Sequence, residues 1–240
     1  GADANDTAPV GTSALVVAAH SGHTELALYL LDQGADPNTD GAGYTALHAA
    51  TLRGDVVMAD ALLAAGADAN ALVTRGSEGR RNSPDYVLEH DVVGATPFWL
   101  AAHFSEPTIM RSLIEHGADA SFVMMNGTTA LHAATAAGRR QEPGLTANAG
   151  ANERRVLDTV TIALDHGTDI AAIDEKGNTV LHDAASRRLD TVVELLVERG
   201  ADLTAQNADG QTPLALATGR GGDDGENQTV ELLRRLGANN

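Results

Sequence analysis

The side chains that could bind a metal ion or transfer protons in this chain are 9 histidines and 33 aspartates and glutamates, spread over 240 residues. Their spacing does not support zinc binding, because no histidine pair has the His-Glu-x-x-His arrangement that places two imidazoles on one helix face. His20 and His23 are three residues apart, but Ser21 and Gly22 between them indicate a helix end. The absence of cysteine excludes disulfides, thiolate nucleophiles and cysteine-based zinc sites.

Two acidic segments have residues of the kind that bind calcium. Asp36, Asn38 and Asp40 have the spacing of the first half of a calcium loop, but the twelfth position requires a bidentate Glu and is Leu47. We therefore expect residues 36–41 to form a turn in which Asp and Asn bond to the local backbone. The segment 221–227 leaves weak calcium binding open as an alternative.

Other motifs for catalysis and for phosphate binding are missing. The sequence has no Gly-x-Ser-x-Gly nucleophile motif, no Gly-x-x-x-x-Gly-Lys-Ser/Thr loop and no Gly-x-Gly-x-x-Gly dinucleotide motif. The net charge of −17 argues against nucleic acid or an anionic membrane as a partner. No apolar run approaches the ~18 residues that span a bilayer. We expect no catalytic residues, no metal and no cofactor, and an enzyme of unknown type is kept only as an alternative.

Two short phrases recur along the chain and indicate six structural repeats. The first, Gly-x-Ser/Thr-Ala/Pro/Val-Leu/Phe-x-x-Ala, occupies residues 11–18, 43–50, 94–101, 127–134, 177–184 and 210–217. The second, Gly-Ala/Thr-Asp/Asn, begins at Gly34, Gly66, Gly117, Gly167, Gly200 and Gly237. Apolar stretches lie between the two phrases, and one repeat alone cannot bury them. The repeats are therefore expected to stack on one another.

The first phrase carries a family resemblance. Thr45-Ala46-Leu47-His48 and Thr96-Pro97-Phe98 resemble the Thr-Pro-Leu-His motif of the ankyrin repeat family, whose unit is a β-turn finger followed by two antiparallel helices. The resemblance covers nearly the whole chain and implies an all-α solenoid of helix–turn–helix units with β-turn fingers. It implies a structural role, the bridging of backbone groups, for the histidines that end the motif, His48, His132 and His182. Trp99 takes this position in the third unit and is expected to be buried.

The phrases also predict where helices begin and end. Ser or Thr at the third position of the first phrase can cap a helix by accepting from free backbone N–H groups. Pro97 and Pro213 follow such residues and fit the first turn of a helix, where no N–H is needed. Each closing glycine is expected to end a helix in the left-handed conformation.

We expect a single ankyrin repeat domain over residues 1–240. Its repeats are assigned to residues 6–38, 39–71, 91–121, 122–171, 172–204 and 205–240, after the end of a preceding repeat at 1–5. A finger insertion at 72–90 and an inter-helix insertion at 139–152 interrupt the array. Both are rich in Gly, Pro or Asn at their centres and are expected to be loops, which in compact folds are often functional.

The predicted function is non-catalytic protein–protein interaction, as in a scaffold. In ankyrin proteins the fingertips and the exposed side of the first helix line a concave groove, where the resemblance places Tyr44, Arg53, His103, Phe104, Met125 and Asn126. The finger insertion adds the candidates Arg75, Arg80, Arg81 and Tyr86. Aromatic and arginine side chains are enriched at protein interfaces. Two alternatives remain: Phe104 packs under the inserted finger, and the protein binds a small ligand or calcium.

The two ends of the array give further expectations. Unit one offers apolar residues such as Leu15, Val17 and Leu26 without a polar cap, which predicts further ankyrin repeats N-terminal to this segment or another chain that covers unit one. Arg234 and Arg235 suit a helix C-terminus and predict that unit six is an end cap. The resemblance to long bacterial ankyrin arrays favours a bacterial protein, and a periplasmic or secreted location over the cytoplasm.

Overall fold

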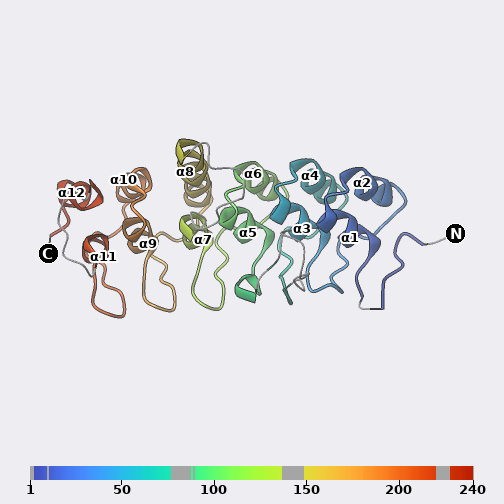
Figure 1. Cartoon of the computed structure of the whole chain (residues 1–240), viewed down its shortest axis with the longest axis horizontal. Coiled ribbons are helices and arrows are strands. Elements are labelled where there is room, and N and C mark those ends of the chain that lie inside the picture. Colours follow the sequence, from blue (N-terminus) through green and yellow to red (C-terminus); the bar gives the residue numbers. More distant parts are fainter. Residues whose placement is uncertain are drawn as a thin grey trace. The chain divides into compact units, whose positions relative to one another are not determined.

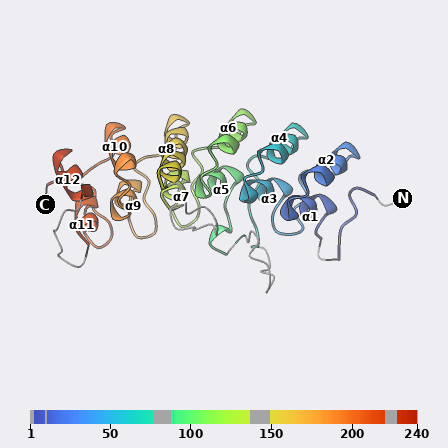
Figure 2. The ribbon, with the colours of Figure 1, turned by 45° about the horizontal axis from the view of Figure 1, so that its top comes forward.

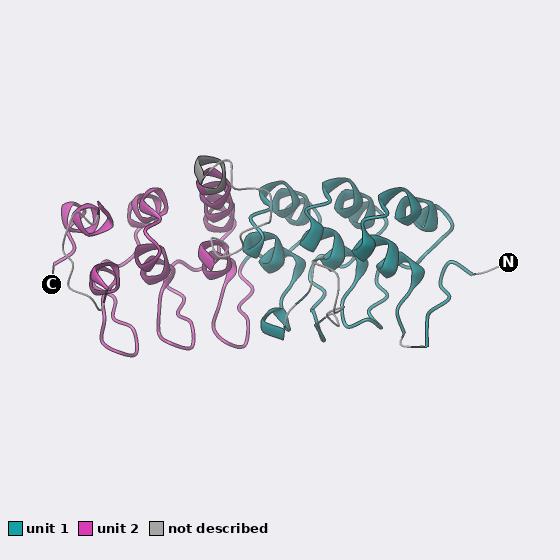
Figure 3. Ribbon diagram, in the orientation of Figure 1, with its two compact units in different colours: residues 1–120 teal, residues 121–240 magenta. Residues whose placement is uncertain are grey.

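The structure is a computed structural model, which describes residues 3–9, 11–76, 88, 90–136, 149–219 and 228–239. Over these residues it is helical, with two isolated antiparallel bridges and no longer strand. The all-α architecture predicted from the repeats is confirmed. The chain divides into two compact units, residues 1–120 and 121–240 (Figure 3). A single domain over all 240 residues stays a prediction.

The first unit consists of three helical hairpins and a short 3-10 helix, η1 (His90–Val92). The hairpins are formed by α1 (Ala14–Ser21) with α2 (Thr24–Asp32), α3 (Ala46–Arg53) with α4 (Val56–Ala64), and α5 (Pro97–His103) with α6 (Pro107–Glu115). The first helices α1, α3 and α5 pack side by side, and so do the second helices α2, α4 and α6. Figure 1 shows these two rows and the finger loops that project away from the row of second helices.

The second unit repeats this arrangement. Its hairpins are α7 (Ala130–Ala136) with α8 (Ala149–Asp165), α9 (Val180–Ser186) with α10 (Asp190–Glu198), and α11 (Pro213–Thr218) with α12 (Gln228–Arg235). In Figure 2 the helices α7, α9 and α11 again form one row within the unit, and α8, α10 and α12 the other. The helix α8 begins at Ala149, so residues 149–152 of the expected insertion are helical rather than loop. Ala149 and Ala151 favour this extension by their helix propensity, whereas Gly150 and Asn152 do not.

The predicted helix boundaries are confirmed at the repeat phrases. Ser13 accepts a hydrogen bond from the backbone N–H of Val16, and Thr96 and Thr212 make the same contact at α5 and α11. Pro97 and Pro213 lie in the first turns of their helices. All six closing glycines have a positive φ, between 83° and 110°, which Gly adopts without the penalty that a Cβ imposes.

The motif histidines bridge one repeat to the next, as the resemblance implied. In the first unit the backbone N–H of Thr45 donates to Nδ1 of His48 over 3.1 Å, which leaves the proton on Nε2. Nε2 then donates to the carbonyl oxygen of Ala71 over 3.0 Å. His182 makes the equivalent contacts with Thr179 and Gln211 in the second unit. Each imidazole therefore caps its own helix and holds the finger loop that follows.

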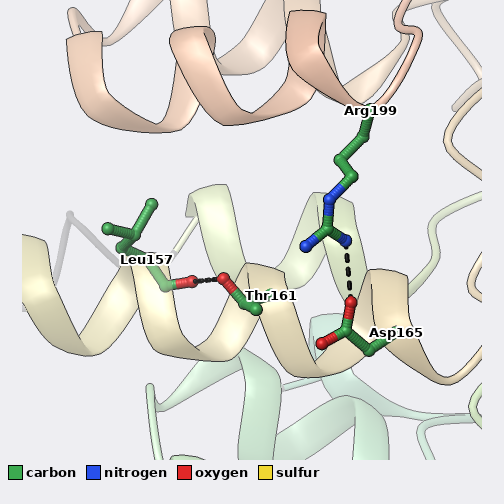
Figure 4. Close-up of polar contacts among 4 residues, drawn as sticks. All are labelled: Leu157, Thr161, Asp165 and Arg199. Atoms are coloured by element: carbon green, nitrogen blue, oxygen red, sulfur yellow. Dashed lines mark hydrogen bonds and ion pairs between the residues drawn. The ribbon is translucent and has the colours of Figure 1, made fainter.

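The second helices of the second unit are joined by ion pairs. Arg199, just after α10, reaches Asp165 at the end of α8 with a separation of 2.8 Å (Figure 4). Thr161 on α8 donates its hydroxyl to the carbonyl oxygen of Leu157 over 2.8 Å, which satisfies the side chain within its own helix. Arg235 and Glu194 form a similar ion pair between α12 and α10 at 3.3 Å.

Candidate functional site

Tyr44, expected to be an exposed residue of the groove, is buried in the first unit. Its relative exposure is 7%, and its ring lies 5.6 Å from the ring of His20 on α1. The Tyr44 hydroxyl and Nδ1 of His20 are 3.3 Å apart, within hydrogen-bond distance. Burial raises the pKa of Tyr44, while the positive charge of Arg75 acts in the opposite direction. Tyr44 therefore contributes to the contact between the first two repeats, and its role as a partner anchor stays a prediction.

The two described arginines among the groove and finger candidates of the first unit contact the fold itself. Arg53, at the end of α3, donates from Nη1 to the carbonyl oxygen of His20 over 3.1 Å. This oxygen lies at the C-terminal end of α1, where a positive charge is favourable. Arg75 donates from Nη2 to the carbonyl oxygen of Gly41 over 3.0 Å and lies against Gly43. A Cβ at Gly43 would come within 2.5 Å of the Arg75 Cβ, so this finger requires glycine there.

His103 and Phe104 belong to an aromatic row at the end of α5. Trp99 stacks on His103 with ring centroids 5.2 Å apart, and His103 meets Phe104 edge-to-face at 4.9 Å. Trp99 is buried, as expected, and its Nε1 has no hydrogen-bond partner among the residues that the structure describes. His103 and Phe104 are half-buried. They present part of their surface to solvent, in contrast to Tyr44.

The finger of the fourth repeat places Met125 in full contact with solvent. Val123 on the same finger and Ile173 on the next finger are each about half exposed. The two fingers lie side by side, and the backbone N–H of Glu175 donates to the carbonyl oxygen of Asn126 over 2.9 Å. We call Val123, Met125 and Ile173 the finger patch. The side chain of Asn126 is occupied within its own turn, where its Oδ1 accepts from the backbone N–H of Thr128 over 3.1 Å.

The close approach of the two fingers depends on Gly127. Its φ is 78°, and a Cβ there would come within 2.4 Å of the carbonyl oxygen of Ile173. Met125 and Asn126 are among the site residues expected from the sequence, whereas Val123 and Ile173 are not. Comparing the position four residues before each finger glycine would have found them, because Thr39 and Gln206 occupy it in other repeats.

Three of the sequence-derived candidates, Arg80, Arg81 and Tyr86, lie outside the described residues. Of the finger insertion, the described parts include both ends. At its beginning, the backbone N–H of Val73 donates to the carbonyl oxygen of Ala95, which follows the insertion, over 3.0 Å. The insertion therefore leaves and rejoins the repeat at neighbouring points, and Arg75 lies exposed beside this stem.

One carboxyl group on α9 has the raised pKa that an acid–base catalyst could use. Burial raises the pKa of Asp183, and the charges of His132 and Arg187 act against this shift while that of Asp174 adds to it. Asp174 accepts hydrogen bonds from the backbone of Lys176 and Asn178, and His132 is within bonding distance of the carbonyl oxygen of Asn178. Both neighbours therefore have structural contacts of their own.

The described residues contain neither a candidate metal site nor a membrane-spanning helix. None of their His, Asp and Glu side chains forms a group of three or more that could hold a metal ion. In the part of the chain that is described, no helix combines the length and apolar character needed to cross a bilayer.

The segment 36–41, which resembles the first half of a calcium loop, forms a turn. Asp36 accepts from the backbone N–H of Asn38 over 2.9 Å, which confirms the turn predicted for this segment.

The comparison with protein-family models agrees with the repeat pattern and the fold. A model described as ankyrin repeats in three copies matches residues 1–73, and a model described as ankyrin repeats in many copies matches residues 164–217. Together the two matches cover just over half of the chain, and the intervening hairpins have the same architecture. The chain belongs to the ankyrin repeat family. Ankyrin repeats generally mediate protein–protein interaction and are generally non-catalytic.

Proposed function

We propose that this protein is a non-catalytic interaction module that binds a protein partner through its finger loops and the adjoining groove. The observation that carries the proposal is the finger patch, three large apolar side chains on two neighbouring fingers of the second unit. Apolar groups of this kind gain free energy when a partner removes them from water, about 25 cal/mol for each Å². Contiguous exposed apolar surface is characteristic of interaction sites, whereas single exposed residues are common everywhere.

The surroundings of the finger patch also suit a protein partner. Glu175 and Lys176 flank Ile173 on the fifth finger and are both exposed. A rim of polar and charged groups around an apolar centre is typical of protein interfaces. The backbone hydrogen bond from Glu175 to Asn126 links the two fingers before binding, which lowers the entropy lost on association.

The groove and the finger insertion of the first unit form a second candidate surface, which belongs to that unit alone. His103 and Phe104 contribute partly exposed aromatic area there, and Arg75 contributes an exposed positive charge in an otherwise acidic chain. Arginine can bond to carboxylates or backbone carbonyls of a partner. Arg80, Arg81 and Tyr86 belong to this proposal through their sequence positions alone. A bacterial origin and a periplasmic or secreted location also remain proposals, which fractionation of the producing cells would test.

A pulldown from the producing cells, using matched surface variants, tests the proposal. Met125→Ser combined with Ile173→Ser removes most of the finger patch, while Val57→Ser changes an apolar residue on α4 that is 63% exposed. All three side chains are largely exposed, so melting temperatures should stay close to that of the wild type. We expect a partner retained by the wild type and by Val57→Ser to be reduced on the double variant by at least roughly tenfold. Equal retention on all three proteins would exclude the finger patch as the binding surface.

A further inference from the structure

Of the 4 methionines in the sequence, all of which lie in the described part of the chain, only Met125 in the finger patch is open to solvent. Met58 on α4 and Met110 on α6 are 0% exposed. Met124, the direct neighbour of Met125, is 6% exposed. A reagent dissolved in water therefore meets the thioether sulfur of Met125 and not those of the other three.

A β-turn holds the side chain of Met125 away from the fold. The backbone N–H of Gly127 donates to the carbonyl oxygen of Met124 over 2.9 Å, which closes a four-residue turn. Met125 and Asn126 are the two central residues of this turn, at the tip of the finger. Met124 begins the turn, and its side chain is buried instead. The exposure of Met125 thus follows from the backbone of the finger.

The sulfur of an exposed methionine can be oxidised by peroxides. Hydrogen peroxide transfers one oxygen atom to Sδ, so that an S–O bond forms while the O–O bond breaks. The sulfur loses two electrons to the peroxide, and the transferred oxygen gives its proton to the departing hydroxide, which leaves as water. The product is methionine sulfoxide, which is polar and chiral. Methionine sulfoxide reductases return it to the thioether and release water, with a dithiol as the reductant that becomes a disulfide.

Oxidation changes the finger patch at its most exposed side chain. Val123 and Ile173 stay apolar, whereas the sulfoxide oxygen of Met125 accepts hydrogen bonds from water. A partner that covers the patch has to remove this water, and burying a polar oxygen without a donor costs free energy. Surfaces that bind through methionine are disrupted in this way.

From these observations we infer that Met125 is an oxidation-sensitive switch of the finger patch, which hydrogen peroxide turns off and methionine sulfoxide reductases turn on again. The inference rests on the proposed function, because the switch acts on the binding of a protein partner to this patch. The thioether is the binding form, and the sulfoxide binds the same partner at least roughly tenfold more weakly. The fold is the same in both forms, because the side chain of Met125 is not buried in either repeat.

Graded oxidation of the folded protein tests the reactivity of Met125. After brief treatment with hydrogen peroxide, tandem mass spectrometry of peptides locates each added oxygen atom. We expect Met125 to be oxidised several-fold faster than Met124 in the folded protein, and the difference to vanish in urea, where both side chains are exposed. Equal rates for the two neighbours in the folded protein would overturn the inference, whatever the protein binds.

Pulldowns with matched variants test the effect of oxidation on binding. The probe is a protein from an extract of the producing cells that the wild type retains and the double variant Met125→Ser, Ile173→Ser does not. Its retention should fall at least roughly tenfold on wild type that was treated with peroxide and then freed of it. Retention should recover after incubation of the oxidised protein with methionine sulfoxide reductases and dithiothreitol.

The adjacent methionines supply the matched controls. Met125→Leu cannot form a sulfoxide, so peroxide should leave its retention of the probe at the value that this variant has before treatment. Met124→Leu should respond to peroxide as the wild type does. An equal loss in Met125→Leu would contradict the inference, because another group would then be the sensitive one. An unchanged melting temperature of the oxidised wild type excludes unfolding as the cause of the loss.

The experiments separate the switch from the proposed function. Undiminished retention of the probe by wild type whose Met125 is oxidised would refute the switch and leave the proposed function standing. If the untreated wild type retains no protein that the double variant loses, the proposed function fails, and the switch fails with it. The mass spectra decide the reactivity of Met125 in either case.

Discussion

The two compact units share one helical plan but join their repeats with different polar contacts. In the first unit, Asn5, Asn38 and Asn70 each bridge to the closing turn of the next repeat. The two bonds of Asn70, for example, reach the carbonyl oxygen of Gly117 over 2.9 Å and the backbone N–H of Asp119 over 2.8 Å. These bonds satisfy backbone groups at helix ends, which otherwise lack a partner within the helix.

The second unit keeps the closing turn but loses the bridge. Asp169 and Asp202 still accept from the backbone two residues further on, yet the bridging position is Ala171 or Thr204. Ion pairs between the second helices join these repeats instead, as Arg199 and Asp165 do. Exposed ion pairs contribute little because water competes for both charges. The comparison indicates that repeat stacking tolerates the loss of one polar link when apolar packing is kept.

The fingers differ between the units as well. In the first unit the aromatic ring of Tyr44 turns inward onto His20, whereas in the second unit Met125 points into solvent. One finger residue therefore stabilises the fold, and the other is available to a partner.

The largest effect is expected from Tyr44→Ala. Removing a buried aromatic side chain leaves a cavity and should cost about 3–5 kcal/mol of unfolding free energy. Tyr44→Phe removes only the hydroxyl near His20 and should cost about 1 kcal/mol. Met125→Ala in the second unit should change the unfolding free energy by less than about 0.5 kcal/mol. Urea unfolding of the three variants measures these differences, and equal costs for Tyr44→Ala and Met125→Ala would remove the contrast between the fingers.

The acid sensitivity of the buried histidine is the next largest effect. Burial lowers the pKa of His48 to about 4 from its ordinary value of 6.5, although hydrogen bonds to carbonyl oxygens oppose the shift. The folded state favours the neutral imidazole of His48, so the stability that this imidazole contributes is fully present above pH 6.5. Between pH 6.5 and 4 the unfolded chain binds a proton that the folded chain does not, which should lower the unfolding free energy by roughly 3 kcal/mol.

His48→Phe isolates this contribution, because other groups titrate alike in both proteins. The unfolding free energy of the variant should fall less than that of the wild type between pH 6.5 and 4, in urea titrations at several pH values. The repeat at α5 already has an aromatic residue, Trp99, at this position. His182→Phe is the matched change in the second unit, where burial also lowers the pKa of the histidine. Identical slopes for wild type and His48→Phe would show that His48 is not the acid-sensitive group.

The asparagine bridges can be removed from one unit and added to the other. Asn38→Ala loses two hydrogen bonds to the backbone and should cost about 1–2 kcal/mol. Ala171→Asn places an amide at the position of the second unit that is equivalent to Asn38. We expect this amide to bond to the closing turn at Gly200 and to gain about 1 kcal/mol. Melting curves of both variants measure the effects. A loss of stability in Ala171→Asn would mean that the closing turns of the two units are not equivalent.

Much of the fold could be predicted from the sequence because its signals are local. Ser13 and Thr96 cap helices within three residues of themselves, and Gly34 ends a helix through its own backbone conformation. The role of His48 could be predicted as well, since the motif places it in the first turn of α3 beside Thr45. Interactions over such short distances depend little on the rest of the chain.

The direction of finger side chains could not be predicted in the same way. Tyr44 turns inward because His20 of the preceding repeat lies within ring contact, which the finger sequence alone does not reveal. Ile173 is exposed although it is as apolar as many core residues. The start of α8 at Ala149 was missed because no repeat phrase marks it. The misses at Tyr44 and Ile173 therefore concern fingers, whose side-chain exposure depends on the neighbouring repeats, and the miss at Ala149 concerns a helix start without a sequence signal.

The smallest effect is expected from the ion pair of the second unit. Arg199→Ala should cost only about 0.5 kcal/mol, because the arginine and Asp165 side chains remain 38% and 53% exposed. The cost should shrink further in 1 M salt, which screens exposed charges. The double-mutant cycle with Asp165→Ala measures the pairwise term by urea unfolding at low and high salt. A coupling energy above about 2 kcal/mol would show that this ion pair rivals the asparagine bridges of the first unit. The contrast between the two units would then lie in the chemistry of their links rather than in their strength.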